Sequence, residues 1–283
     1  MTPLASELAR LSASEMVSAL GVTRAPGLLR RGLELPFRAA SRSLGQTLSE
    51  LDCGLAERGL PVAAARALAS CRVGLRVSGS SVHHGPCLVL ANHPGAYDAL
   101  ALMAALDRPD LLILAADRQF LRALSQLSLR HMCLVGSGAG ERAGALRRCL
   151  SWLRRGGAVL HFPAGQIEPD ADFEPAQGCW LGAWQPGVPA LLKACARAEG
   201  SVLLAGVRGV HSPSAKRALL VRWAERRGVT TLSPLLQLWR GLTDVKARVR
   251  LSQAGQAGEL TQLAPEQQVE RLRAALLSAI ASA

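Results

Sequence analysis

Residues 87–98, CLVLANHPGAYD, join a short apolar run to a Pro-Gly turn and an acidic residue. The apolar run, residues 87–91, is typical of a buried strand, and residues 98–106 are typical of the helix that follows it. Polar groups between a strand and a helix lie where α/β proteins place ligands, beyond the carboxyl end of the strand. The stretch therefore predicts a strand–turn–helix unit with a candidate site in its turn.

Similar units follow along the chain. Alternating strands and helices favour a mostly parallel sheet with helices on both faces, so the predicted fold class is α/β. Residues 245–251 alternate apolar and basic side chains, which predicts a half-exposed edge strand. The other strands are expected at residues 111–115, 132–135, 158–162 and 201–207, and the other helices at residues 119–129, 141–155, 187–198 and 265–280.

The N-terminal part has a different pattern and is expected to form a helical segment. We predict two parts: residues 1–70, helical and interrupted by Pro and Gly, and residues 71–283, the α/β domain. Residues 24–48 combine leucines with arginines and contain one acid, Glu34. Such a segment can lie in a membrane interface, or it can be an ordinary helix whose leucines face the core.

The composition excludes several classes of protein. The 283 residues are 49% hydrophobic, which is too apolar for a disordered chain, and carry a net charge of +12. The sequence contains no run of roughly 18 apolar residues, so a membrane-spanning helix is not expected. Seven cysteines without a C-x-x-C motif indicate buried thiols of a reduced, cytosolic protein, and aromatic residues, at 4%, are too few to favour single-strand nucleic-acid binding.

Two residues of the first stretch have the chemistry of a catalytic pair. His93 is expected at the exit of the strand and Asp98 in the first turn of the helix. If the Pro-Gly turn brings them together, the carboxylate fixes the imidazole tautomer and leaves one ring nitrogen free as a general base. The alternative is a locally hydrogen-bonded histidine with Asp98 as the helix N-cap.

A second polar turn, HFPAGQ at residues 161–166, follows another predicted strand. Its proline and glycine predict a tight turn whose backbone N–H groups can face an anion or a developing oxyanion. The alternative is a plain strand-to-loop turn.

Together the two turns resemble the motifs of the lysophospholipid acyltransferase family, the 1-acylglycerol-3-phosphate acyltransferase group. That family carries an N-H-x-x-x-x-D block after a strand and a later F-P-E-G-T-R block. The first block is complete in this chain, but Ala164 replaces the glutamate of the second, and Gln166 and Ile167 stand where Thr and Arg are usual. The variant F-P-A-G looks like the branch of lyso-ornithine lipid acyltransferases. The resemblance covers residues 73–255, and the matching positions are Asn92, His93, Asp98, Phe162, Pro163 and Gly165.

The resemblance implies a glycerol-3-phosphate acyltransferase-like fold and a catalytic mechanism. His93 would be the general base on an acceptor hydroxyl, Asp98 would orient it, and backbone amides near Gly165 would stabilise the oxyanion. The donor would be acyl-CoA or acyl carrier protein, with no cofactor and no metal. Substrate-binding roles would fall to Asn92, Arg118, Phe162, Pro163 and Gly165, while Arg122 and Arg130 are either helpers or part of a solvated helix face.

The partners implied are a lipid acceptor and an acyl thioester donor, and no nucleic acid. The location implied is the inner face of the cytoplasmic membrane, as a peripheral protein. Because the second block has lost its arginine, lysophosphatidic acid and a different amphiphilic alcohol fit equally well as acceptors.

Three other interpretations stay open at this point. A non-catalytic lipid-binding protein could use the same scaffold. The residues Gly138, Gly140 and Ala143 weakly imitate a dinucleotide-binding fingerprint. A metal could in principle be held by His83, His84, His93 and Asp98.

Overall fold

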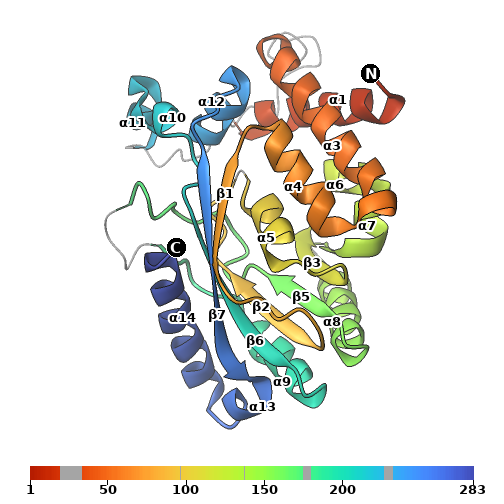
Figure 1. Ribbon diagram of the computed structural model, residues 1–283, viewed down its shortest axis with the longest axis vertical. Helices are drawn as coiled ribbons and strands as arrows, with labels where there is room; N and C mark the ends of the chain where they lie inside the picture. The colour runs from red at the N-terminus through yellow and green to blue at the C-terminus, as the bar shows by residue number, and fades with distance from the viewer. Residues whose placement is uncertain (20–33, 96, 137, 175–179, 226–231) are drawn as a thin grey trace.

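A computed structural model describes residues 1–19, 34–95, 97–136, 138–174, 180–225 and 232–283 (Figure 1). In this part of the chain seven strands form one sheet in the order β1-β7-β6-β2-β5-β3-β4. The first five of the strands along the chain are β1 (Gly74–Gly79), β2 (Cys87–Ala91), β3 (Leu111–Ala116), β4 (Met132–Val135) and β5 (Ala158–His161), and the last two are β6 (Ser201–Arg208) and β7 (Lys246–Gln256). Every pairing is parallel except that of β6 with β7, which confirms the prediction of a mostly parallel sheet.

Helices cover both faces of the sheet, which explains why β2 is buried along its whole length. Val89 and Ala91 face one apolar cluster, and Leu88 and Leu90 face the other, as the alternation of a strand requires. The first cluster is covered by α1 (Pro3–Ala19), α3 (Arg38–Arg58), α4 (Leu60–Ser70) and α5 (Asp98–Leu106), and the second by α8 (Ala139–Arg154), α9 (Val188–Arg197), α13 (Ala257–Leu260) and α14 (Pro265–Ala281).

The expectation that residues 245–251 form an edge strand is wrong. The strand β7 lies between β6 and β1, because β1 pairs with its outer side. The sequence of β1, GLRVSG, is short and partly polar, so it gave no strand signal. The basic face of β7 is nevertheless partly exposed, as expected: Lys246 is exposed, and Arg248 pairs with Asp172 of the loop that follows β5.

The helix predicted at residues 119–129 is two helices, α6 (Gln119–Ala123) and α7 (Ser125–His131). Asp52 of α3 accepts hydrogen bonds from the backbone N–H groups of Gln126 and Leu127, at 3.2 and 2.8 Å. A carboxylate there satisfies the first amides of α7 as a cap would, so a contact far away in the sequence starts a new helix.

The N-terminal helices share their core with the sheet. Leu8, Leu51 and Leu55 belong to the same buried cluster as Val89 and Ala91. The division into residues 1–70 and 71–283 stays a prediction, and residues 24–33 of the leucine–arginine segment lie outside the described residues. Where the structure describes a helix, none is both long and apolar enough to cross a membrane.

The cysteines of the described part carry free thiols. Cys87, Cys133, Cys149 and Cys195 are buried, as expected. Cys53 is exposed on α3, so the expectation of burial is wrong for this residue, and Cys179 lies outside the description.

Three short helices follow β6 before the chain returns through β7. They are α10 (Pro213–Arg217), α11 (Leu219–Glu225) and α12 (Leu232–Arg240). Figure 1 shows them at the same end of the molecule as α1 and the start of α3, opposite the end that carries α9 and α13. The 3₁₀-helix η1 (Leu35–Phe37) packs against α12 through the rings of Phe37 and Trp239.

Candidate active site

The candidate site lies where three neighbouring parallel strands end. Strand β2 lies between β6 and β5, and the residues that follow β2 and β5 are the two polar turns of the sequence. Gly95 has a φ of 91°, which glycine adopts at no steric cost, and its N–H and C=O face Asp98. The chain thus folds back after Pro94 and enters α5.

This turn brings His93 and Asp98 together. The imidazole Nδ1 lies 2.7 Å from the Asp98 Oδ2. The carboxylate also accepts the N–H of Gly95 at 2.7 Å and that of Ala99 at 2.5 Å, and it is almost completely buried. Tyr97, not Asp98, is the N-cap of α5, so the alternative assignment of Asp98 as the cap is wrong.

The arrangement leaves the other ring nitrogen of His93 open. Since a carboxylate accepts from Nδ1–H, the neutral imidazole carries its lone pair on Nε2. Nε2 bonds to no described residue, and the side chain is 30% exposed. The Phe162 ring lies against the imidazole with its centroid 4.5 Å away, so the ring is held on one side and reachable on another.

The charges around His93 favour its protonated form. Burial lowers the pKa of this imidazole, but the charge and hydrogen bond of Asp98 and the charge of Glu168 together outweigh it, and the pKa is raised. An imidazole of this kind remains neutral above its raised pKa and holds a proton firmly once it has taken one.

Glu168 is the residue of the site that sequence reasoning missed. Its Oε2 accepts the backbone N–H of His93 at 2.8 Å, and its own N–H donates to the His93 carbonyl at 2.7 Å. Its Oε1 accepts the N–H of Gly182 at 2.7 Å. Only one signal pointed to it: the second block lacks its usual glutamate at Ala164, and Glu168 is the next acidic residue.

The environment of Glu168 is unusual for a carboxylate. The residue is 3% exposed, and burial raises its pKa. The hydrogen bonds from the backbone N–H groups of His93 and Gly182 oppose this shift, as do the charges of the His93 and Arg273 side chains. A buried carboxylate whose two oxygens each accept a backbone N–H is a fixed part of the structure, so Glu168 holds the backbone of His93 in place.

Asn92 is also engaged with the backbone. Its amide donates to the Val207 carbonyl and accepts the Val207 N–H, both at 2.7 Å, and the residue is completely buried. The side chain therefore continues the pairing of β2 with β6 beyond the last residue of β2. Both polar atoms of the amide are thus engaged with the backbone of β6, and the substrate-binding role of Asn92 stays a prediction.

The second polar turn holds its backbone by internal bonds. Gly165 has a φ of 65°, and its N–H donates to the Phe162 carbonyl at 3.0 Å. That N–H is therefore not free for an oxyanion, contrary to the simplest form of the expectation. The Pro163 carbonyl accepts the N–H of Gln185 at 2.8 Å. His161, at the end of β5, stays neutral because burial lowers its pKa to about 4.

The three arginines of the expectation follow β3, which is not adjacent to β2 in the sheet. Arg118 is the N-cap of α6, exposed at the carboxyl end of β3, and its guanidinium bonds to no described residue. Strand β5 separates β3 from β2 in the sheet. Arg122 pairs with Asp117 at the surface, and Arg130 is exposed at the end of α7, which favours the solvated helix face for both.

Two alternative sites are not formed. Within the described ranges no three His, Cys, Asp or Glu side chains come together to hold a metal ion, so His83 and His84 do not join His93 and Asp98. At the start of α8 the Gly138 N–H donates to its own Glu141 at 2.9 Å, which occupies the position that a dinucleotide phosphate would need.

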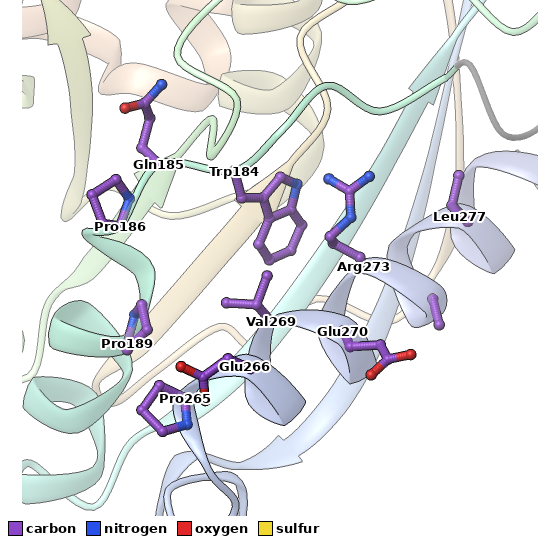
Figure 2. Close-up of a pocket in the computed structure, with 11 residues that line it drawn as sticks. Trp184, Gln185, Pro186, Pro189, Pro265, Glu266, Val269, Glu270, Arg273 and Leu277 are labelled. Carbon is purple, nitrogen blue, oxygen red and sulfur yellow. The ribbon is translucent and has the colours of Figure 1, made fainter.

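A cavity of about 700 Å³ lies behind the second polar turn, between residues 184–189 and α14 (Figure 2). Figure 2 shows Trp184 facing Val269, with Arg273 beside the indole ring. The lining is largely apolar, and neither His93 nor Asp98 contributes to it. The cavity is therefore separate from His93 and Asp98, although the backbone N–H of Gln185, one of its lining residues, donates to the Pro163 carbonyl.

Comparisons with known proteins agree with this geometry. A family model described as Acyltransferase matches residues 74–194, which contain both polar turns. The chain is also similar to the crystal structure of the 1-acyl-sn-glycerophosphate (LPA) acyltransferase, PlsC, from Thermotoga maritima, with a TM-score of 0.51 and 12% identity over 99% of this chain and 94% of that one. At this identity the likeness shows a shared fold, and no curated protein matches the sequence. Residues 74–194 thus match a family model of acyltransferases, and the chain as a whole shares the fold of a lysophospholipid acyltransferase.

Proposed function

We propose that this enzyme transfers a fatty acyl group from acyl-CoA or acyl carrier protein to the hydroxyl of a lysophospholipid or similar amphiphilic acceptor. His93 is the general base, and Asp98 orients it. One observation carries the proposal: Nδ1 of His93 lies 2.7 Å from a buried carboxylate, while Nε2, on a partly exposed ring, bonds to no residue that the structure describes. PlsC of Thermotoga maritima, which shares the fold, is named for transfer to a lysophosphatidic acid.

The reaction needs one proton to move twice. The acceptor hydroxyl donates to Nε2 of His93, and its oxygen attacks the thioester carbonyl as the proton passes to the imidazole. The tetrahedral intermediate collapses, the C–S bond breaks, and the leaving sulfur takes the proton back from Nε2. Asp98 and Glu168 stabilise the imidazolium between the two transfers, in keeping with the raised pKa of His93.

The oxyanion donors are proposed from the same turn. The N–H groups of Gln166 and Ile167 donate to no other described residue, and the Ile167 side chain lies against Gly95. Their neighbour Glu168 is bonded to both backbone groups of His93, which keeps this segment beside the imidazole. Each well-placed donor is worth about 3 kcal/mol in the transition state.

The remaining residues have supporting roles in this proposal. Asn92 positions the end of β2, and Phe162 and Pro163 pack the imidazole and the turn. Arg118, exposed at the same edge of the sheet, is our candidate for the phosphate of a phosphorylated acceptor or donor. The reaction requires no cofactor and no metal, and we place the protein on the inner face of the cytoplasmic membrane as a peripheral enzyme.

The proposal is tested by acceptor-dependent thiol release. The purified full chain is given a long-chain acyl-CoA or acyl carrier protein, with lysophosphatidic acid or lyso-ornithine lipid as acceptor, and the acylated product is identified by mass spectrometry. We expect release that depends on one of these acceptors. Release that no acceptor increases would reduce the activity to thioester hydrolysis. Vesicle binding without any release would favour the non-catalytic lipid-binding alternative.

Glu168→Gln is expected to lower kcat by about tenfold and leave KM nearly unchanged. A glutamine oxygen can accept one of the two backbone N–H groups, but its NH₂ group then faces the other donor, so one bond of about 1–2 kcal/mol is lost. Removing the charge also lowers the pKa of His93, so the acid limb of the kcat/KM profile should move to lower pH. Steady-state kinetics over a range of pH measures both effects.

The matched control is Glu270→Gln, an exposed carboxylate on α14. It should leave both the rate and the pH profile unchanged. If Glu168→Gln reduces thermal stability while kcat and the acid limb stay as in the wild type, the residue is only structural and its positioning role is wrong.

A further inference from the structure

Helix α11 carries a largely exposed apolar face. Leu219 and Leu220 are 82% and 65% exposed, and Trp223 is 55% exposed. These positions lie on one side of the helix, whereas Val221 and Ala224 on the other side are buried. Three large apolar side chains in five residues are far more exposed than a helix that only packs on a core would leave them.

Large apolar side chains are also exposed on neighbouring elements. Trp239 of α12 is 45% exposed and its ring contacts Phe37, and Leu35 of η1 is 52% exposed. Helix α11 packs on α12, and η1 packs on α3, so these side chains belong to connected elements. We call Leu35, Leu219, Leu220, Trp223 and Trp239 the apolar face.

The exposed charges around the apolar face are mostly positive. Arg217 and Arg222 are exposed at α10 and α11, and Arg38 and Arg240 at α3 and α12. The Glu225 carboxylate is neutralised by Lys216 at 2.5 Å. Leucine and tryptophan with flanking arginines are the side chains that enter the boundary between lipid headgroups and acyl chains.

Hydrogen bonds connect the elements that carry the apolar face to the turn that holds His93. His211, which precedes α10, bonds through Nε2 to the Pro94 carbonyl at 2.8 Å. Gln237 of α12 accepts the N–H of Ser212 at 2.7 Å and donates to the Val210 carbonyl at 3.2 Å. Helices α10–α12 therefore start at the carboxyl end of β6, next to the strand whose end carries His93.

We propose that the apolar face inserts into the headgroup region of an anionic membrane and sets the catalytic turn at the level of the lipid acceptor. The proposal rests on the proposed function and names the surface that makes the enzyme peripheral. Charge complementarity selects the occupant: the arginines match lipid phosphates, whereas a second copy of this chain would bring like charges together. An acidic carrier protein would match the arginines but would leave the leucines and tryptophans unused.

The test is vesicle binding by the full chain. Vesicles of phosphatidylcholine alone are compared with vesicles that also contain phosphatidylglycerol, by co-sedimentation. The double variant Leu219→Asp/Leu220→Asp should bind at least about tenfold more weakly than the wild type, because two leucines that would enter the lipid are replaced by charges that anionic lipid repels. Arg217→Ala/Arg222→Ala should weaken binding only to the phosphatidylglycerol vesicles.

The matched control is Leu129→Asp, since Leu129 is 74% exposed on α7, outside the apolar face. It should bind vesicles like the wild type. Equal binding by the wild type and the Leu219→Asp/Leu220→Asp variant overturns the proposal. The proposal is also overturned if the Leu219→Asp/Leu220→Asp variant binds vesicles like the wild type but loses self-association or affinity for acyl carrier protein. That result would assign the apolar face to a protein partner.

Failure of this proposal can be told apart from failure of the proposed function. Thiol release is measured in parallel with a short-chain acceptor that stays monomeric in solution. If the variant keeps this rate and loses vesicle binding, both proposals stand. If it keeps this rate and keeps vesicle binding, only the docking proposal fails. Circular dichroism melting confirms that these exposed substitutions leave the fold intact.

Discussion

His93→Ala is expected to lower kcat/KM for acyl transfer by a factor of about 10²–10⁴, the usual contribution of a general base. The substitution removes Nε2, the ring nitrogen that no described residue engages, and leaves the Asp98 carboxylate with its two backbone donors. The loss should fall on kcat, because the imidazole acts on the proton that moves in the transition state. Acceptor-dependent thiol release measures it.

The control for this prediction is His83→Ala. His83 is exposed before β2, and its removal should leave the rate unchanged. Vesicle binding by His93→Ala should also be unchanged, since the apolar face is intact. A His93→Ala enzyme within a few-fold of the wild-type kcat/KM would remove the histidine from the mechanism.

Asp98→Asn is expected to lower kcat/KM by about 10²–10³ and to move the acid limb of its pH profile to lower pH. Asparagine can donate to Nδ1, which favours the tautomer with the proton on Nε2 and leaves no base toward the acceptor. The sign of the pH effect follows from Asp98, whose charge and hydrogen bond raise the pKa of His93. Without them that pKa falls, so the imidazole is neutral at lower pH.

Asp107→Asn is the matched control on the same helix. Asp107 is exposed at the C-cap of α5 with a φ of 50°, a conformation that asparagine adopts readily. It should change neither the rate nor the pH profile. Because Asp98→Asn also weakens one of two backbone bonds, its melting temperature is measured alongside; an unchanged acid limb in a folded variant would contradict the assigned pairing.

The arrangement of the sheet could be read from the sequence where strands are buried on both faces. Cys87–Ala91 and Met132–Val135 have the bounds that the apolar runs predicted. The order at the β7 side could not be predicted, because β1 has few apolar residues and gains its place only by pairing with β7. The break at Leu124 was equally hidden, since the capping carboxylate belongs to α3.

In the candidate site, the local contact could be predicted from the sequence, whereas the long-range contacts could not. His93 and Asp98 are five residues apart, and the Pro-Gly turn between them is visible in the sequence, so their contact could be expected. The two supporting contacts join residues that are far apart in the sequence. The Glu168 carboxylate accepts the backbone N–H of His93, 75 residues away, and the Asn92 amide bonds to the backbone of Val207, 115 residues away. Backbone partners have no sequence signature, which is why the support of the site came only from the structure.

The position of Glu168 has a consequence for how sequences that only partly match a family's motifs are found. A search that demands an acidic residue between the proline and glycine of the second block would discard this chain, since Ala164 stands there. In the structure, however, the Glu168 carboxylate still accepts the backbone N–H groups of both His93 and Gly182. Descriptors written as three-dimensional anchor points would retain such divergent sequences, whereas letter patterns lose them.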